Sequence, residues 1–268
     1  MFGSILGDIV GSRFEWKPNK TESFNMFDDS CINKQYRSHF TDDSVMSCGT
    51  AKASLENKTY QECYIELGRK YPNAGYGGSF KKWLHSANPT PYNSFGNGSG
   101  MRVAPVGWMF STMEETLREA EKSAKCSHDH PEGIKGAQGV AAAIFMARTD
   151  SSKSEIAKFI EDKFEYDLSR DLDDIRLTYK FDVTCQGSVP ESIIAFLEST
   201  DLESAIRKAI SLGGDSDTQA CMAGAIAEAF YKEIPLYMYQ EMKKRLAPDL
   251  LDIAVAFHSK YCKEVAIK

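Results

Sequence analysis

The sequence predicts an all-α protein that folds as one domain over residues 1–268. Apolar side chains recur at the three- and four-residue spacing of a helix along most of the chain. Strand signals are scarce, and the sequence shows no alternation of strands with helices, no internal repeat and no low-complexity tract. A chain of 268 residues is long enough to bury a substantial core, which agrees with a single domain.

The clearest helical pattern covers residues 217–231. Small residues on this segment would let the backbone of another helix approach closely, and they are Ala220, Ala223, Gly224 and Ala227. The same periodicity predicts helices over 44–57, 59–71, 113–124, 135–148, 153–163, 189–198, 202–212 and 248–261. Three of these helices follow a residue that is suited to an N-cap: Thr59, Ser151 and Asp201.

Polar and apolar residues alternate convincingly only over 175–184, which predicts a lone short strand or an extended segment. Loops are expected over 15–40, 72–100 and 125–134, and a helix is expected to start at Met101. Glycine and asparagine crowd the second loop, in NAGYGGS and NSFGNGSG. Long loops on a rigid scaffold commonly carry function, so we expect ligand contacts there.

Composition narrows the class of protein. The net charge is −6, with 38 acidic and 32 basic residues, whereas a general nucleic-acid binder needs a basic surface. None of the seven cysteines forms a Cys-x-x-Cys pair, which argues against a structural zinc site or a disulfide framework. The first residues lack a basic leader, and no apolar run approaches the roughly 20 residues of a membrane span. We therefore expect a cytoplasmic protein.

Two acidic clusters stand at predicted helix starts: Thr41-Asp42-Asp43-Ser44 and Asp215-Ser216-Asp217-Thr218. Helix capping explains either cluster taken alone, because threonine and aspartate are preferred N-caps and acids favour the first turn. Capping needs only one acceptor, however, and each cluster offers two carboxylates and a hydroxyl. Carboxylates gathered in one pocket would repel each other unless cations lay between them, and oxygen ligands suit Mg²⁺ or Mn²⁺. The metal hypothesis therefore requires that the two clusters meet in space.

Other acidic motifs fit less well. The second cluster lacks the spacing and the distal glutamate of an EF-hand loop. Met46 stands where an isoprenoid synthase would need the last aspartate of Asp-Asp-x-x-Asp, and neither cluster has the Asp-Thr/Ser-Gly of an aspartic protease.

Taken together, the motifs resemble those of the ADP-ribosylglycohydrolase family, in the same order along nearly the whole chain. They are Gly7-Asp8-Ile9-Val10-Gly11 with Glu15, Phe40-Thr41-Asp42-Asp43-Ser44, Gly75-Tyr76-Gly77-Gly78, the run from Gly96 to Ala104, Ser127-His128, and Gly213-Gly214-Asp215-Ser216-Asp217-Thr218. The resemblance implies an orthogonal all-α bundle. It also implies a centre of two Mg²⁺ or Mn²⁺ ions held by Thr41, Asp42, Asp43, Asp215, Asp217 and Thr218.

In such a centre the ions would engage the vicinal hydroxyls of a terminal ribose and orient a water. The general base would be Asp43 or Asp42, and Glu15 matches a glutamate at the mouth of the site that is linked to catalysis. Without the resemblance, Glu15 would be interpreted as an exposed loop acid. The implied substrate contacts are Gly75, Gly77, Gly78, Ser94, Phe95, Asn97, Gly98, Ser99, Gly100, Met101 and His128, with Tyr92 or Phe95 stacked on adenine.

The predicted function is hydrolytic removal of ADP-ribose from a modified protein side chain, arginine being the first choice. The alternatives are the same chemistry on O-linked serine, poly(ADP-ribose), O-acetyl-ADP-ribose or a modified nucleobase, and a non-catalytic ADP-ribose-binding protein. The expected partner is an ADP-ribosylated protein or a small ADP-ribose conjugate, bound by a monomer. With 268 residues the chain is short for the family, so loops that confer substrate choice elsewhere are expected to be missing.

Overall fold

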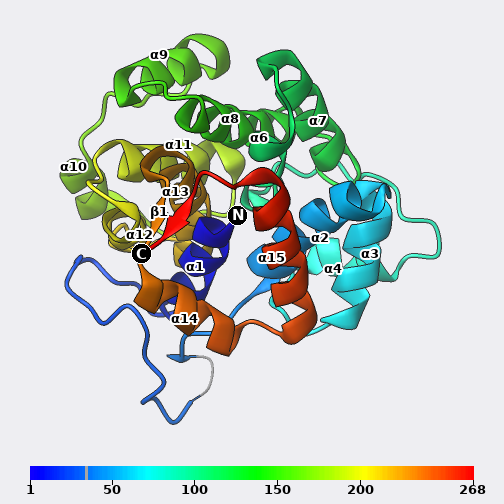
Figure 1. Ribbon diagram of the computed structural model, residues 1–268, viewed down its shortest axis with the longest axis horizontal. Helices are drawn as coiled ribbons and strands as arrows, with labels where there is room; N and C mark the ends of the chain where they lie inside the picture. The colour runs from blue at the N-terminus through cyan, green and yellow to red at the C-terminus, as the bar shows by residue number, and fades with distance from the viewer. Residues whose placement is uncertain (34–35) are drawn as a thin grey trace.

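The computed structural model describes residues 1–33 and 36–268, and helices account for most of this part of the chain (Figure 1). The all-α prediction is confirmed. The helices are α1 (Phe2–Gly11), α2 (Asp42–Glu56), α3 (Tyr60–Lys70), α4 (Gly78–His85), α5 (Gly98–Met101), α6 (Val106–Met109), α7 (Met113–Lys125), α8 (Pro131–Arg148), α9 (Lys153–Phe164), α10 (Leu172–Thr178), α11 (Cys185–Leu197), α12 (Leu202–Ile210), α13 (Ser216–Tyr231), α14 (Leu236–Arg245) and α15 (Pro248–Tyr261), with a 3₁₀ turn, η1, over Ser12–Phe14. Strands β1 (Glu233–Ile234) and β2 (Ala266–Ile267) pair in parallel.

Helices α1 and α13 form the centre of the molecule, with their backbones in contact (Figure 1). Three glycines spaced four residues apart on α1 make this approach possible. A Cβ added at Gly3 would lie 2.2 Å from the Gly224 carbonyl oxygen, and one at Gly7 would lie 2.0 Å from that of Ala220. A Cβ at Gly11 would lie 2.5 Å from the Cα of Asp217. The small residues of α13 therefore accept a helix, as the sequence predicted, and α1 runs directly beside the second acidic cluster.

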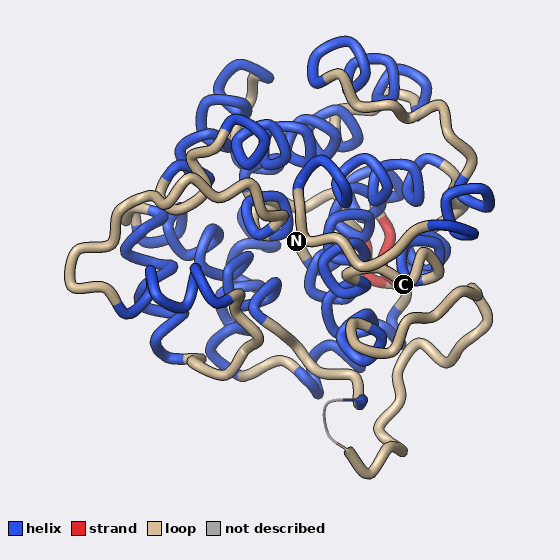
Figure 2. Tube along the Cα trace, turned by 180° about the vertical axis from the view of Figure 1, so that it is seen from behind, coloured by secondary structure: helices blue, strands red, loops and turns tan. Residues whose placement is uncertain are grey.

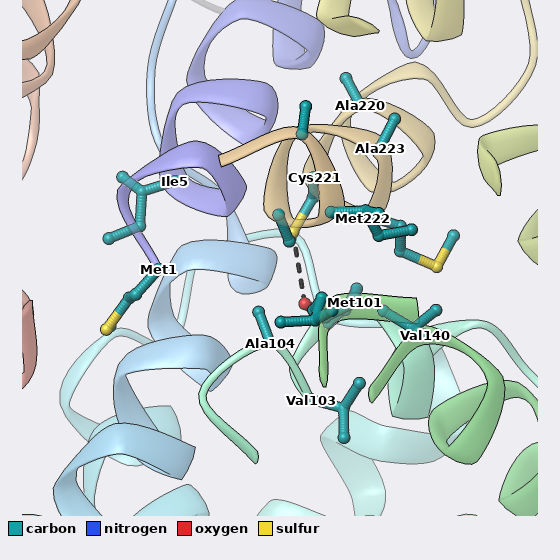
Figure 3. Close-up of a cluster of buried hydrophobic side chains, with 14 of the residues drawn as sticks. Met1, Ile5, Met101, Val103, Ala104, Val140, Ala220, Cys221, Met222 and Ala223 are labelled. Atoms are coloured by element: carbon teal, nitrogen blue, oxygen red, sulfur yellow. Dashed lines mark hydrogen bonds between the residues drawn. The ribbon is translucent and has the colours of Figure 1, made fainter. Parts of the chain in front are cut away.

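Helices α8, α11 and α12 pack on the other sides of α13, and α2 packs between α3 and α15. Where α5 meets α8 and α13, the core is made of aliphatic and sulfur-containing side chains, among them Met101, Val140 and Met222 (Figure 3). The thiol of Cys221 donates a hydrogen bond to the Met101 carbonyl oxygen at 3.3 Å, which ties α5 to α13 (Figure 3). This packing supports the floor of the site described below.

The helices predicted from periodicity are all present, with shifted ends, but several local predictions were wrong. The cap of α9 is Ser152 rather than Ser151, and its side chain forms a capping box with Glu155. Thr59 and Asp201 cap α3 and α12 as expected. The predicted strand over 175–184 is helical as far as Thr178, because Asp171 caps α10 and two apolar side chains one turn apart, Leu172 and Ile175, are buried.

After Thr178 the chain runs without regular structure to a single antiparallel bridge between Thr184 and Gly96. The predicted helix start at Met101 was also wrong, since α5 ends there. The predicted loop 72–100 contains α4 and most of α5, and residues 34–35 of the predicted loop 15–40 lie outside the described residues. Seen from behind, long loops cross the surface between the helices (Figure 2). Within the described ranges, no helix is both long and apolar enough to cross a membrane.

Candidate active site

The two acidic clusters meet in space. One carboxylate oxygen from each of Asp8, Asp43 and Asp217 lies within 4.8 Å of the other two. A second group, made by Glu15, Asp215 and Asp217, meets the same limit. The two groups share Asp217, so the carboxylates form one continuous patch between α1, α2 and α13. The spatial condition for a metal site is therefore met.

Asp8 was not assigned a role from the sequence, and it organises one side of the patch. Its carboxylate is fully buried and accepts hydrogen bonds from both the backbone N–H and the hydroxyl of Thr41, at 2.9 and 2.7 Å. The backbone N–H and hydroxyl of Ser44 donate to the same carboxylate. Four donors thus bind this aspartate to the first turn of α2. The signal in the sequence was a single acid inside an otherwise apolar or small-residue run, FGSILGDIVG.

Helix capping explains only part of the arrangement. The hydroxyl of Thr41 accepts the Asp43 N–H at the start of α2, at 3.4 Å, as an ordinary N-cap would. Asp215 occupies the N-cap position of α13 but makes no side-chain capping bond, and it accepts a hydrogen bond from the Asn97 amide at 2.8 Å instead. The Oδ1 atom of Asp43 is buried and has no hydrogen-bond partner among the described residues.

Burial dominates the electrostatics of the patch. It raises the pKa of Asp8, Asp42, Asp43, Asp215 and Asp217, and the charge of neighbouring carboxylates adds to the rise at Asp42, Asp43 and Asp217. Burial, together with the charges of Asp217 and Asp8, also raises the pKa of Glu15 to about 8. A buried oxygen without a partner and a set of carboxylate and hydroxyl donors fit a hard divalent cation such as Mg²⁺ or Mn²⁺.

A cavity of about 560 Å³ opens above the carboxylates. Most residues expected to contact metal or substrate line it: Glu15, Asp42, Asp43, Gly75, Gly77, Gly78, Ser94, Phe95, Asn97, Gly98, Met101, His128, Asp215, Asp217 and Thr218. Gly75 has a φ of +110°, and a Cβ there would lie 3.1 Å from Asp42 Oδ1. A glycine therefore both permits this turn and leaves the Asp42 carboxylate free on the cavity side.

Three expected site residues lie behind the cavity wall. The Thr41 side chain is 5% exposed and contacts Asp8, Asp43 and Asp217 through its hydroxyl. The Ser99 hydroxyl donates to the Gly133 carbonyl oxygen at 2.7 Å, and Gly100 faces Met222. These last two positions support the floor of the cavity.

The loop from Tyr92 to Asn97 forms one wall and is fastened to the segment before α11. The Asn97 N–H donates to the Val183 carbonyl oxygen at 2.8 Å, and the Cys185 N–H donates to that of Phe95 at 2.9 Å. The Phe95 ring is 44% exposed and meets His130 edge to face, with centroids 5.3 Å apart. A half-exposed ring in this position offers a surface for a planar ligand.

His128 and Arg102 lie at the base of this wall. Burial and the positive charge of Arg102 lower the pKa of His128 well below its usual value, which favours the neutral imidazole. The Ser127 hydroxyl lies 2.8 Å from His128 Nδ1. Arg102 itself donates to the Ser123 carbonyl oxygen and to the Ser127 hydroxyl, and its guanidinium lies over the Tyr64 ring. Its hydrogen bonds therefore hold the chain around His128 and do not reach the carboxylates.

Comparison with known proteins confirms the family that the motifs resemble. The ADP-ribosylglycohydrolase family model matches residues 1–264. The chain is 26% identical over 337 aligned positions to ADP-ribosylhydrolase ARH3 of Xenopus tropicalis, covering 99% of this chain and 95% of that protein. It is 26% identical to ADP-ribosylhydrolase ARH3 of Homo sapiens, covering 85% and 83%. It is also 24% identical to the putative ADP-ribosyl glycohydrolase L543 of Acanthamoeba polyphaga mimivirus, covering 88% and 87%.

A solved structure titled ADP-ribosylglycohydrolase-related protein complex superimposes with a TM-score of 0.71 at 19% identity, covering 96% of this chain and 94% of that one. This likeness shows a shared fold. The family match extends over nearly the whole chain and includes every acidic residue of the patch. The chain therefore belongs to the ADP-ribosylglycohydrolase family of hydrolases that act on ADP-ribosylated substrates.

Proposed function

We propose that the protein uses two divalent cations, Mg²⁺ or Mn²⁺, to hydrolyse the glycosidic bond at the terminal ribose of an ADP-ribose conjugate. The observation that carries this proposal is the pair of carboxylate groups that share Asp217. Two groups of oxygen donors with a common member suit two neighbouring ions better than one. The residues proposed to hold them are Thr41, Asp42, Asp43, Asp215, Asp217 and Thr218.

A pair of such ions bound there supplies Lewis acidity toward the ribose hydroxyls and lowers the pKa of a water. The other catalytic roles belong to side chains of the protein. Asp42 and Asp43 both line the cavity, but Asp42 is only half-buried, whereas Asp43 is 2% exposed and contacts the hydroxyls of Thr41 and Thr218. Because a general base must reach the water from the substrate side, we assign that role to Asp42 and a ligand role to Asp43.

Loss of the leaving group builds positive charge at the anomeric carbon, and the surrounding carboxylates, including Glu15, stabilise it. The pyrophosphate is proposed to lie against the glycine-rich loop, where Gly96, Asn97 and Gly98 line the cavity. The neutral imidazole of His128 suits a hydrogen bond to substrate without adding charge. Phe95 is proposed to stack on the adenine.

The leaving group proposed first is the side chain of an ADP-ribosylated arginine. The same arrangement would act on O-linked conjugates such as ADP-ribosyl-serine, poly(ADP-ribose) or O-acetyl-ADP-ribose. The alternative function is non-catalytic: the protein would bind ADP-ribose without cleaving it. Retention of all six proposed ligands argues for turnover.

The test combines calorimetry with a substrate panel. ADP-ribose is titrated into wild type and into an Asp215→Ala/Asp217→Ala variant, each with EDTA or with Mg²⁺. The matched control removes an exposed pair of adjacent aspartates on α10, as Asp173→Ala/Asp174→Ala. Binding that requires Mg²⁺ in wild type and control, and is lost in the first variant, supports the site. Equal binding by all three proteins would mean that the acids only cap helices.

Release of ADP-ribose is then measured from ADP-ribosyl-arginine, ADP-ribosyl-serine, poly(ADP-ribose) and O-acetyl-ADP-ribose in the presence of Mg²⁺. Release from the arginine conjugate confirms the first assignment, and release only from an O-linked conjugate replaces it. Metal-dependent binding with no release from any of them would identify a binding protein.

A further inference from the structure

We infer that a lip beside the cavity, formed by Trp16, Lys17, Lys180 and Phe181, binds the polypeptide that carries the ADP-ribose. The preferred partner is a segment with acidic and apolar residues next to the modified side chain. This inference rests on the proposed function, and it adds a recognition surface for the leaving group.

The two aromatic side chains of the lip are exposed although they are large. Trp16 is 66% exposed and Phe181 is 42% exposed, and both line the opening of the cavity. Their rings stack on each other with centroids 5.4 Å apart and an interplanar angle of 26°, a separation within the usual range of about 4.5–7 Å for aromatic pairs. An exposed pair of stacked rings that borders a functional cavity is typical of a contact surface.

The lip is held in place before any partner binds. The ammonium group of Lys20, on the loop that carries Trp16, donates to the carbonyl oxygens of Arg176 and Tyr179, at 2.9 and 2.7 Å. It also donates to the carbonyl oxygen of Leu212, just before the second acidic cluster. Lys20 therefore joins the loop of Trp16 to the segment that leads into Phe181. A surface that is already ordered loses little conformational entropy when it binds.

The position of the lip indicates which part of a substrate it meets. Trp16 directly follows Glu15, whose carboxylate belongs to the group with Asp215 and Asp217. The reacting ribose is proposed to lie over those carboxylates, and the adenine lies beyond two phosphates at the other end of ADP-ribose. Trp16 and the rest of the lip lie beside these carboxylates, away from the adenine. They are therefore placed to contact the leaving group and the polypeptide attached to it.

The charge of the lip indicates the chemistry of that chain. Lys17 and Lys180 are both exposed, and neither makes an ion pair within the described residues. Of the acids in the same segment, Asp182 accepts the Thr184 N–H at 2.7 Å and Asp173 pairs with Arg176. Two free cations beside two exposed rings complement a peptide with acidic and apolar side chains.

The test measures kcat/KM for three substrates with the same linkage: an acid-flanked ADP-ribosylated peptide, its lysine-flanked counterpart, and the free ADP-ribosyl amino acid. Arginine and serine linkages are both prepared. The variants are Trp16→Ala, Phe181→Ala and the double variant Lys17→Ala/Lys180→Ala. The matched controls are Leu177→Ala and Lys163→Ala, exposed residues that do not line the cavity.

We expect each aromatic variant to lower kcat/KM for the acid-flanked peptide about tenfold relative to the free conjugate, as loss of a central aromatic contact does. The double lysine variant should reduce the preference for acidic over basic flanks about two- to threefold, and more at low salt. The two controls should change neither ratio.

Unchanged ratios in the lip variants would overturn the inference while leaving the proposed function intact. Equal losses on peptide and free conjugate would also overturn it, because the lip would then bind ADP-ribose itself. A preference for poly(ADP-ribose) over the acidic peptide that disappears in these variants would assign the lip to a nucleotide instead. If wild type cleaves no conjugate of either linkage, the proposed function fails and the inference fails with it.

Discussion

Replacing Asp217 with asparagine should stabilise the metal-free protein and remove its response to Mg²⁺. Asp217 belongs to both carboxylate groups, in which the ligand atoms lie within 4.8 Å of one another. At an effective dielectric constant of about 20, two charges at this separation repel by about 3.5 kcal/mol. Asparagine keeps one oxygen to accept from the Thr218 N–H, whereas its amide NH₂ replaces the oxygen that accepts from the Thr41 hydroxyl at 3.4 Å. That hydroxyl still donates to Asp8 at 2.7 Å, so the variant loses charge at the loss of one long hydrogen bond.

The net gain should be smaller than that repulsion, at about 1–3 kcal/mol, because burial raises the pKa of Asp215 to about 7 and that of Glu15 to about 8, so part of the patch carries protons near neutrality. Melting temperature rises by roughly 2–4 °C per kcal/mol for a chain of about this length, so thermal unfolding in EDTA detects the change. In Mg²⁺ at about 100 times its dissociation constant, wild type should gain about 2.7 kcal/mol and the variant almost nothing.

The order of stability should therefore reverse: the variant melts above wild type in EDTA and below it in Mg²⁺. Asp174→Asn is the control, because it removes an exposed acid from α10 and should follow wild type under both conditions. If Asp217→Asn lowers the melting temperature equally in EDTA and in Mg²⁺, the carboxylate is a structural hydrogen-bond acceptor and the electrostatic argument is refuted.

Three further results are expected. In urea unfolding, the free energy of unfolding of the metal-free wild type should fall as the pH rises from about 5 to 8. The folded state raises the pKa of the patch carboxyls and so binds more protons than the unfolded chain. A free energy of unfolding that does not change over this pH range would contradict the expectation. Gly7→Ala should cost about 1–3 kcal/mol, since its Cβ would lie 2.0 Å from the Ala220 carbonyl oxygen, whereas Gly78→Ala, with open space around it, should not. Asp8→Asn should cost about 1–3 kcal/mol by leaving a donor on Thr41 or Ser44 unpaired, and calorimetry should show weaker Mg²⁺ binding.

The sequence predicted α13, which is buried along nearly its whole length, from the spacing of its apolar and small residues, but it missed α1. Helix α1 is buried along its whole length, so FGSILGDIVG has no exposed side to produce a helical pattern. Its three glycines also oppose helix formation locally, by about 1 kcal/mol each. Packing against α13 overrides that preference, and this packing is a tertiary fact that local periodicity does not contain.

The acidic patch was only partly predictable, for a related reason. Acidic residues close together in the sequence, such as Asp42 with Asp43 and Asp215 with Asp217, predict a local acidic cluster without further information. The meeting of the two clusters depends on α1, because Gly11 contacts the backbone of Asp217 while Asp8, three residues earlier, binds Thr41. The role of Asp8 therefore follows from the distance between two helices and could not be derived from its own neighbours.

This packing also explains why the charges remain together. Helices α2 and α13 both begin in the patch, and the partial positive charge of a helix N-terminus favours nearby carboxylates. Four hydrogen bonds to Asp8 and one from Asn97 to Asp215 add to this stabilisation. The pKa values are nevertheless raised, so burial and mutual repulsion outweigh these contacts. Because the backbones of α1 and α13 are in contact, the patch cannot relieve this repulsion by spreading apart. Protons or bound cations are the compensation that remains, and the carboxylates are grouped as the ligands of a metal ion would be.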